Sequence, residues 1–155
     1  MNFRLFLEVI DWKIKGTPLI KLYHGSRKKF PPGFKLVPQV GKGYASWHEN
    51  IQLERFMEEW RPKGKISRFD SVFLVDDPEM CEYAGGYDDH IYLVEPQGQV
   101  DRSDLSWYSQ VDLFEPGSVS GIECAKNYWN GVPFEDPYHA LWEYRCRSAI
   151  VLEEI

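Results

Sequence analysis

The chain has 155 residues, of which 43% are hydrophobic and 15% aromatic, and its formal net charge is −6. This length predicts a single domain over residues 1–155, and the apolar content suffices for a buried core, which excludes a disordered chain. The acidic balance argues against a general nucleic-acid-binding protein, because such proteins carry a basic face.

No stretch approaches the roughly 20 apolar residues that span a bilayer, and charged residues interrupt the first apolar stretch, which is untypical of a signal peptide. We therefore expect a cytoplasmic protein, in its own cell or in a cell that it enters, without a membrane partner. The three cysteines, Cys81, Cys124 and Cys146, form no C-x-x-C pair and predict neither a disulfide framework nor a zinc site. We also expect no other metal site, because His48, His90 and His139 are widely spaced; Asp88-Asp89-His90 could bind a cation, but its composition favours a turn before a strand. The glycine motifs of P-loop and Rossmann proteins are absent.

The predicted elements begin with a short amphipathic helix over residues 2–12, where apolar side chains recur at helical spacing. Residues 19–23 read as a strand that delivers His24-Gly25-Ser26 at its C-terminal end. The segment 27–46 is rich in Gly, Pro and Lys, which indicates a loop.

The middle of the chain contains the clearest helix, over residues 49–60. A β-rich run over 71–75 follows and predicts a buried strand. Asp77-Pro78 is typical of a helix start, with the aspartate as N-cap and the proline at the first helical position. Residues 90–94 predict another strand, which we expect Pro96 to close.

The last part of the chain begins with residues 98–117, which are polar and predict a loop. Residues 118–130 predict a helix, residues 131–142 a second loop, and residues 143–155 a terminal β-rich segment. Helices and strands therefore alternate irregularly, which indicates an α+β fold.

Four segments occur in an order that resembles a known superfamily. They are Tyr23-His24-Gly25-Ser26, then Val72–Asp76 followed by Tyr83, then His90–Pro96, and finally the loop 131–142 leading into Glu143-Tyr144. Together they resemble the ADP-ribosyltransferases of the His-Tyr-Glu branch, which includes poly(ADP-ribose) polymerases and diphtheria-type toxins. The stretch Ile91–Gly98 is also similar to the rifampicin ADP-ribosyltransferases. The resemblance implies two short antiparallel or mixed sheets that form a central NAD cleft, with flanking helices.

The resemblance assigns the H-G-[ST] motif to NAD binding. His24 would hydrogen-bond a ribose hydroxyl, while Gly25 and Ser26 would hold the nicotinamide amide. These residue types suit the task, because glycine permits close approach and a neutral imidazole both donates and accepts hydrogen bonds. Arg27 or a nearby lysine would face the diphosphate. The alternative for His24 is a structural histidine at a strand end.

The stacking residues of the family correspond here to Phe73 and Tyr83, which would flank the nicotinamide ring. Phe73 stands where the family has a tyrosine, so it keeps the aromatic face and loses the hydroxyl. The alternative for both residues is ordinary core packing.

Glu143 matches the family's glutamate at the start of a late strand. Cleavage of the nicotinamide–ribose bond passes through an oxocarbenium-like state, which a carboxylate beside the ribose stabilises. Glu135 and Asp136 in the preceding loop are the rivals, and Asp136 is the second choice because some relatives place the acid elsewhere. We expect His24 and Glu143 on opposite walls of one cleft.

The resemblance implies a mono-ADP-ribosyltransferase that uses NAD as a substrate and modifies a protein or nucleic acid. A minimal enzyme of this size resembles a toxin, a defence protein or a phage effector, with an antitoxin or a host target as partner. One alternative is a non-catalytic module that binds NAD or ADP-ribose. Another is an RNA 2′-phosphotransferase-like protein of the same fold, for which the sequence offers no convincing set of arginines.

Overall fold

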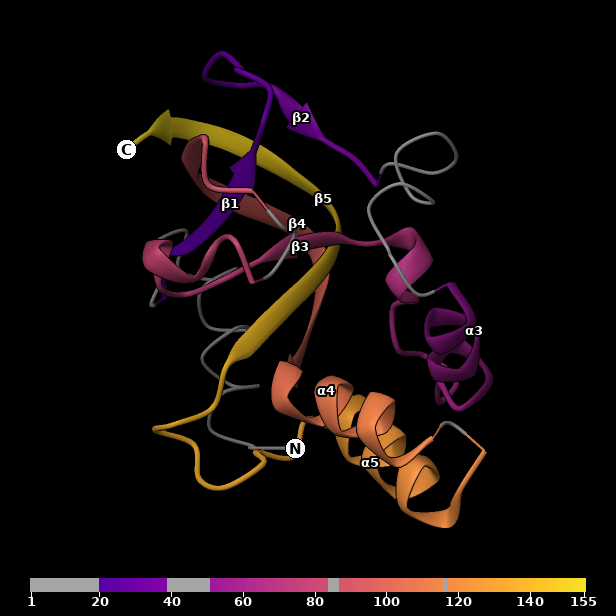
Figure 1. The fold of residues 1–155 in the computed structure, drawn as a ribbon. Helices are drawn as coiled ribbons and strands as arrows, with labels where there is room; N and C mark the ends of the chain where they lie inside the picture. Colours follow the sequence, from indigo (N-terminus) through magenta and orange to yellow (C-terminus); the bar gives the residue numbers. More distant parts are fainter. Residues whose placement is uncertain (1–19, 39–50, 84–86, 116) are drawn as a thin grey trace.

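The computed structural model describes residues 20–38, 51–83, 87–115 and 117–155. Within these ranges the chain has an α+β fold in which three α-helices lie beside one antiparallel sheet of five strands (Figure 1). The elements in chain order are β1 (Leu22–Ser26), β2 (Lys35–Leu36), α3 (Ile51–Glu59), the 3-10 turn η1 (Arg68–Asp70), β3 (Val72–Leu74), the 3-10 turn η2 (Pro78–Met80), β4 (His90–Asp104), α4 (Leu105–Phe114), α5 (Val119–Trp129) and β5 (Trp142–Glu154).

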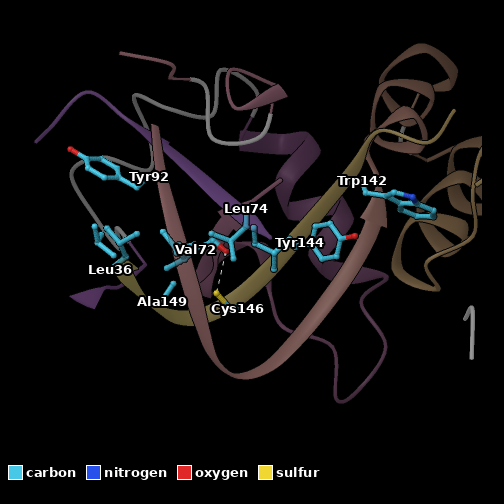
Figure 2. Close-up of a cluster of buried hydrophobic side chains, with 11 residues drawn as sticks. Leu36, Val72, Leu74, Tyr92, Trp142, Tyr144, Cys146 and Ala149 are labelled. Carbon is cyan, nitrogen blue, oxygen red and sulfur yellow. Dashed lines mark hydrogen bonds between the residues drawn. The ribbon is translucent and has the colours of Figure 1, made fainter. Parts of the chain in front are cut away.

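The sheet is built around its two long strands, β4 and β5, which pair along most of their length. The strand order is β1-β4-β5-β2, and β3 pairs with β5 beyond the end of β2. Tyr23 of β1 and Val75, just after β3, exchange two backbone hydrogen bonds of 2.8 and 2.9 Å. The sheet therefore curls until its first strand lies beside the end of β3, and β4 and β5 bend visibly with it (Figure 2).

The curled sheet has a different core on each face. Its inner face carries a cluster of apolar side chains from all five strands, including Val72, Tyr92 and Tyr144 (Figure 2). Its outer face packs against the helices, where Val75 joins Met57 and other helical side chains. Because neighbouring residues of a strand point to opposite faces, Leu22 and Tyr92 lie in the inner cluster, whereas Tyr23 and Ile91 pack against the helical core.

The expected strand over 90–94 is longer than predicted, and the loop over 98–117 is wrong. β4 continues through Pro96 to Asp104, and α4 follows directly. Pro96 pairs with Ala149 of β5, just before the register shifts between Gln97 and Val100, and it lies beyond Val94, the last residue of β4 that pairs with β1. Among the described strands only β5 pairs with β4 at this point, and proline, which lacks an N–H, is accepted where one side of a strand is unpaired. Asp104 then caps α4 by accepting a hydrogen bond of 2.9 Å from the backbone of Ser106.

Several predicted elements are confirmed with shifted ends. The helix over 49–60 corresponds to α3, the strand over 71–75 to β3, the helix over 118–130 to α5 and the terminal segment to β5. Asp77 caps η2, although this turn is a 3-10 helix of only three residues. The expected helix over 2–12 lies outside the described residues, as do residues 39–46 of the expected loop. The described part of that loop contains the short strand β2, which was not predicted.

Two expectations on the sheet need correction. The strand expected over 19–23 is instead Leu22–Ser26, so His24-Gly25-Ser26 forms the C-terminal part of β1 itself, and all three residues pair with β4. The described strands also form one sheet, where two sheets were expected. The length of β4 and β5 explains this difference. These two strands pair with each other, and each shorter strand pairs with one of them, so all the described strands belong to one sheet.

Candidate functional site

Glu143 is buried in a cluster of charged side chains between the sheet and the helices. It is 1% exposed. Its Oε1 accepts hydrogen bonds from Arg68 Nη1 at 2.7 Å and from the Tyr128 hydroxyl at 2.5 Å, and Arg145 Nη1 lies 3.4 Å away. Three donors therefore converge on one carboxylate oxygen.

The same cluster continues to α3 through Arg68. This guanidinium makes two hydrogen bonds to Glu54, of 2.8 and 3.1 Å, and Glu54 also accepts one of 2.7 Å from the Tyr108 hydroxyl. Burial alone would lower the pKa of Arg68, but the charges of Glu143 and Glu54 outweigh this effect and raise the pKa above its usual value. We call the group Glu54, Arg68, Tyr128, Glu143 and Arg145 the Arg68 cluster.

The Arg68 cluster balances two carboxylates with two guanidiniums, so each buried charge has an opposite partner. Arg145 is held further by a hydrogen bond of 2.9 Å to Ser103 Oγ. The cluster ties α3, η1, α5 and β5 together. Its arrangement is that of a structural network, in which Glu143 is already occupied by protein donors.

His24 lies half-buried in β1, with its Nδ1 2.9 Å from the backbone oxygen of Phe73. Since a carbonyl only accepts, Nδ1 carries the proton and donates it. Burial lowers the pKa of His24, although this hydrogen bond opposes the effect. The ring is therefore neutral near pH 7, with Nε2 as its hydrogen-bond acceptor.

The glycine of the H-G-[ST] motif is required by the protein's own backbone. A Cβ at Gly25 would lie 1.9 Å from the backbone oxygen of Tyr87. Ser26 Oγ accepts a hydrogen bond of 3.0 Å from the Lys28 backbone, and the Arg27 guanidinium lies 4.4 Å from the ring centre of Tyr87. These three residues thus contact neighbouring protein groups in the described structure.

The two expected stacking residues differ strongly in burial. Phe73 is 4% exposed, and the Arg68 guanidinium lies 4.9 Å from its ring centre. Tyr83 follows η2 and is 59% exposed. Arg68 thus covers the buried Phe73 ring, whereas the Tyr83 ring is largely exposed.

His24 and Glu143 lie on opposite faces of the curled sheet. His24 pairs with Tyr92, which belongs to the inner cluster, whereas Glu143 pairs with Ser103, which contacts the Arg68 cluster. Residues directly opposite one another on paired strands point to the same face. The expectation that these two side chains face each other across one cleft is therefore wrong for this structure.

A cavity of about 690 Å³ opens on the same face as the inner cluster, at the end where β3, β4 and β5 meet the loop before β5. None of the residues that sequence reasoning assigned to NAD binding lines it. The lining residues are Ile20, Asp76, Asp77, Met80, Arg102, Pro137, Tyr138, His139, Ala140, Leu141, Trp142 and Tyr144.

One wall of this cavity is a connected set of polar and aromatic groups. The Tyr144 hydroxyl donates a hydrogen bond of 3.2 Å to Asp76 Oδ2, and Arg102 interacts with the same hydroxyl. The Arg102 guanidinium lies 3.5 Å from the ring centre of Trp142. Burial raises the pKa of the Asp76 carboxyl, and the hydrogen bond from Tyr144 opposes this effect.

An exposed acid–base pair lies beside the cavity, where His139 is a lining residue and Asp136 is its partner. His139 Nδ1 lies 2.5 Å from Asp136 Oδ2, and the two side chains are 74% and 42% exposed. The hydrogen bond and the charge of Asp136 raise the pKa of His139, and the same hydrogen bond lowers the pKa of Asp136. Asp136, the second choice for the acid, is thus accessible beside a cavity, whereas Glu143 is not.

Sequence reasoning missed Arg102 and Asp76 because neither stands in the matched motifs as a ligand-binding position. Comparison of the sequence with models of protein families and with curated proteins gave no match. In the described ranges, no cluster of three or more His, Cys, Asp or Glu side chains is arranged to hold a metal ion. None of the described helices combines the length and the apolar content that crossing a membrane requires.

Proposed function

We propose that this chain is an ADP-ribosyltransferase-like protein that binds NAD in the cavity beside Arg102 and passes ADP-ribose to a protein or nucleic acid. The cavity carries this proposal. Its volume of about 690 Å³ falls inside the range of roughly 300–1,000 Å³ for cofactor and small-molecule sites. The four segments that resemble the family give further support, because they lie in β1, β3, β4 and the start of β5, which are neighbours in the sheet.

The charges of the cavity complement those of NAD. The dinucleotide carries a negative diphosphate and a positive nicotinamide ring at opposite parts of the molecule. Arg102 supplies a cation, and Asp76 and Asp77 supply carboxylates on the same lining. A ligand that carries both a negative and a positive group is attracted by Arg102 and by the two aspartates, whereas a simple anion would be repelled by the aspartates.

Asp136 is the better candidate for the acid in this proposal. The bond from the ribose anomeric carbon to the nicotinamide nitrogen breaks, its electron pair leaves with nicotinamide, and the acceptor's nucleophile attacks the cationic sugar. An ionised carboxylate next to that carbon stabilises the positive charge. Asp136 is ionised at neutral pH, the hydrogen bond from His139 lowers its pKa further, and its exposed position beside the lining residue His139 leaves it accessible. Glu143 is assigned a structural role.

A binding module without transferase activity is the second candidate. The phenylalanine at position 73 supports it, since Phe73 lacks the hydroxyl of the family's tyrosine and lies buried beneath Arg68. The engagement of Glu143 by Arg68 and Tyr128 supports it as well. NAD or ADP-ribose would then bind in the cavity without cleavage.

The test combines labelled NAD with cell extract and measures nicotinamide release and label transfer. Parallel samples treated with protease or nuclease identify the acceptor class. Asp136→Asn should abolish transfer, while Glu135→Gln, an exposed neighbour in the same loop, should behave like the wild type. NAD binding without nicotinamide release would support the module instead. Absence of NAD binding at millimolar concentration would contradict both candidates.

A further inference from the structure

Arg102 presents its charge in a fixed orientation. The guanidinium lies flat enough on Trp142 to approach within 3.5 Å of the ring centre, and the indole is itself only 7% exposed. A stacked guanidinium keeps its N–H donors at the edge of its plane, where two of them match the oxygens of a phosphate. Arg102 thus offers the cavity a preformed site for an anionic group.

Asp76 sets a second requirement on the ligand. Its carboxylate is linked to Arg102 through the hydroxyl of Tyr144, so the two charged groups belong to one wall. A carboxylate accepts hydrogen bonds from hydroxyl groups and repels an anion that brings none. The wall therefore favours a ligand that carries a phosphate and neighbouring hydroxyls together.

We infer that this cavity holds the phosphorylated ribose of its ligand, with Arg102 on the phosphate and Asp76 on the ribose hydroxyls. This inference rests on the proposed function and specifies which part of the nucleotide is recognised. The aromatic rings of Trp142 and Tyr138 line the same cavity and could contact a nucleotide base. The contact between Arg102 and the phosphate is the one that distinguishes a nucleotide from a nucleoside.

Calorimetry with AMP and adenosine as probes tests the inference, because the two ligands share base and ribose and differ only in the phosphate. The variants are Arg102→Gln and, as a matched loss of one positive charge, Arg147→Gln, whose side chain is 53% exposed on β5. We expect the wild type to bind AMP at least about tenfold more tightly than adenosine, the advantage of a charge-assisted hydrogen bond. Arg102→Gln should remove this advantage, and Arg147→Gln should keep it.

Equal affinities of the wild type for AMP and adenosine would overturn the inference, as would undetectable AMP binding at millimolar concentration. An Arg102→Gln variant that folds and still prefers AMP would overturn it too. Should that variant fail to fold, the wild-type comparison of the two ligands decides alone.

Nicotinamide release from NAD, measured in parallel, separates this inference from the proposed function. Preference for AMP without release would support the phosphate site and contradict transferase activity. Release that Arg102→Gln leaves unchanged would support the transferase and contradict the phosphate site.

Discussion

Replacement of Glu143 by glutamine tests whether this residue holds the fold together. The change keeps the size of the side chain and removes a buried negative charge, which leaves Arg145 without a carboxylate partner while Arg68 retains Glu54. Removal of one member of a buried ion pair costs about 3–5 kcal/mol, and the remaining Glu54 contact places the expected loss near the lower end. For a chain of this size, about 3 kcal/mol corresponds to a fall in Tm of roughly 6–12 °C.

Urea and thermal unfolding followed by circular dichroism measure this loss. Glu153→Gln is the control, because it makes the same substitution at an exposed position of the same strand and should change the free energy of unfolding by less than about 0.5 kcal/mol. A Glu143→Gln protein with the stability of the control and no nicotinamide release would refute the structural role. Glu143 would then be the catalytic acid.

The remaining predictions concern local contacts. Gly25→Ala should cost about 1–3 kcal/mol in unfolding experiments, since its Cβ would meet the Tyr87 backbone at 1.9 Å, whereas Gly117→Ala, with open space around it, should be nearly neutral; equal stabilities would contradict this packing. The raised pKa of His139 means that its pair with Asp136 is complete below the unfolded pKa of about 6.5 and is lost as pH rises through the folded value. NMR titration should therefore find a lower His139 pKa in Asp136→Asn, and an unchanged value would rule out the pair. All three thiols are buried, so they should react with a thiol reagent only after unfolding; rapid reaction of the native protein would contradict their burial.

Local sequence patterns predicted the elements whose signals are local. The apolar spacing of α3 and α5 and the β-rich composition of β3 and β5 were sufficient to find them. The continuation of β4 was missed because Pro96 is ordinarily a terminator, and it is acceptable here because, among the described strands, β4 pairs only with β5 beyond Val94. Whether a strand continues past a proline therefore depends on pairing with residues far along the chain.

The surroundings of Glu143 depend even more on distant residues. Arg68, its closest cation, stands 75 positions earlier, and no local pattern connects the two. One signal was present in β5, where Glu143 and Arg145 alternate with Trp142, Tyr144 and Cys146. Alternation places both charges on one face of the strand, and a helix over that face makes them a buried pair.

The ligand cavity escaped prediction for a related reason. Asp76 follows β3, Arg102 lies near the end of β4, and Trp142 begins β5, so only the folded sheet brings them together. The motif His24-Gly25-Ser26 lies in β1, and Ile20, two residues before this strand begins, lines the cavity. Sequence resemblance indicated the strands, and tertiary packing determined which side chains face open space.

Two tryptophan side chains can report directly on where the ligand binds. Trp142 lines the cavity, while the Trp129 ring lies 5.0 Å from the Arg145 guanidinium in the Arg68 cluster and donates its N–H to the Met57 backbone. In a titration of ¹⁵N-labelled protein with ADP-ribose, we expect the indole N–H signal of Trp142 to shift and that of Trp129 to stay. A shift of Trp129 with an unchanged Trp142 would place the ligand at the Arg68 cluster and contradict the assignment of the cavity.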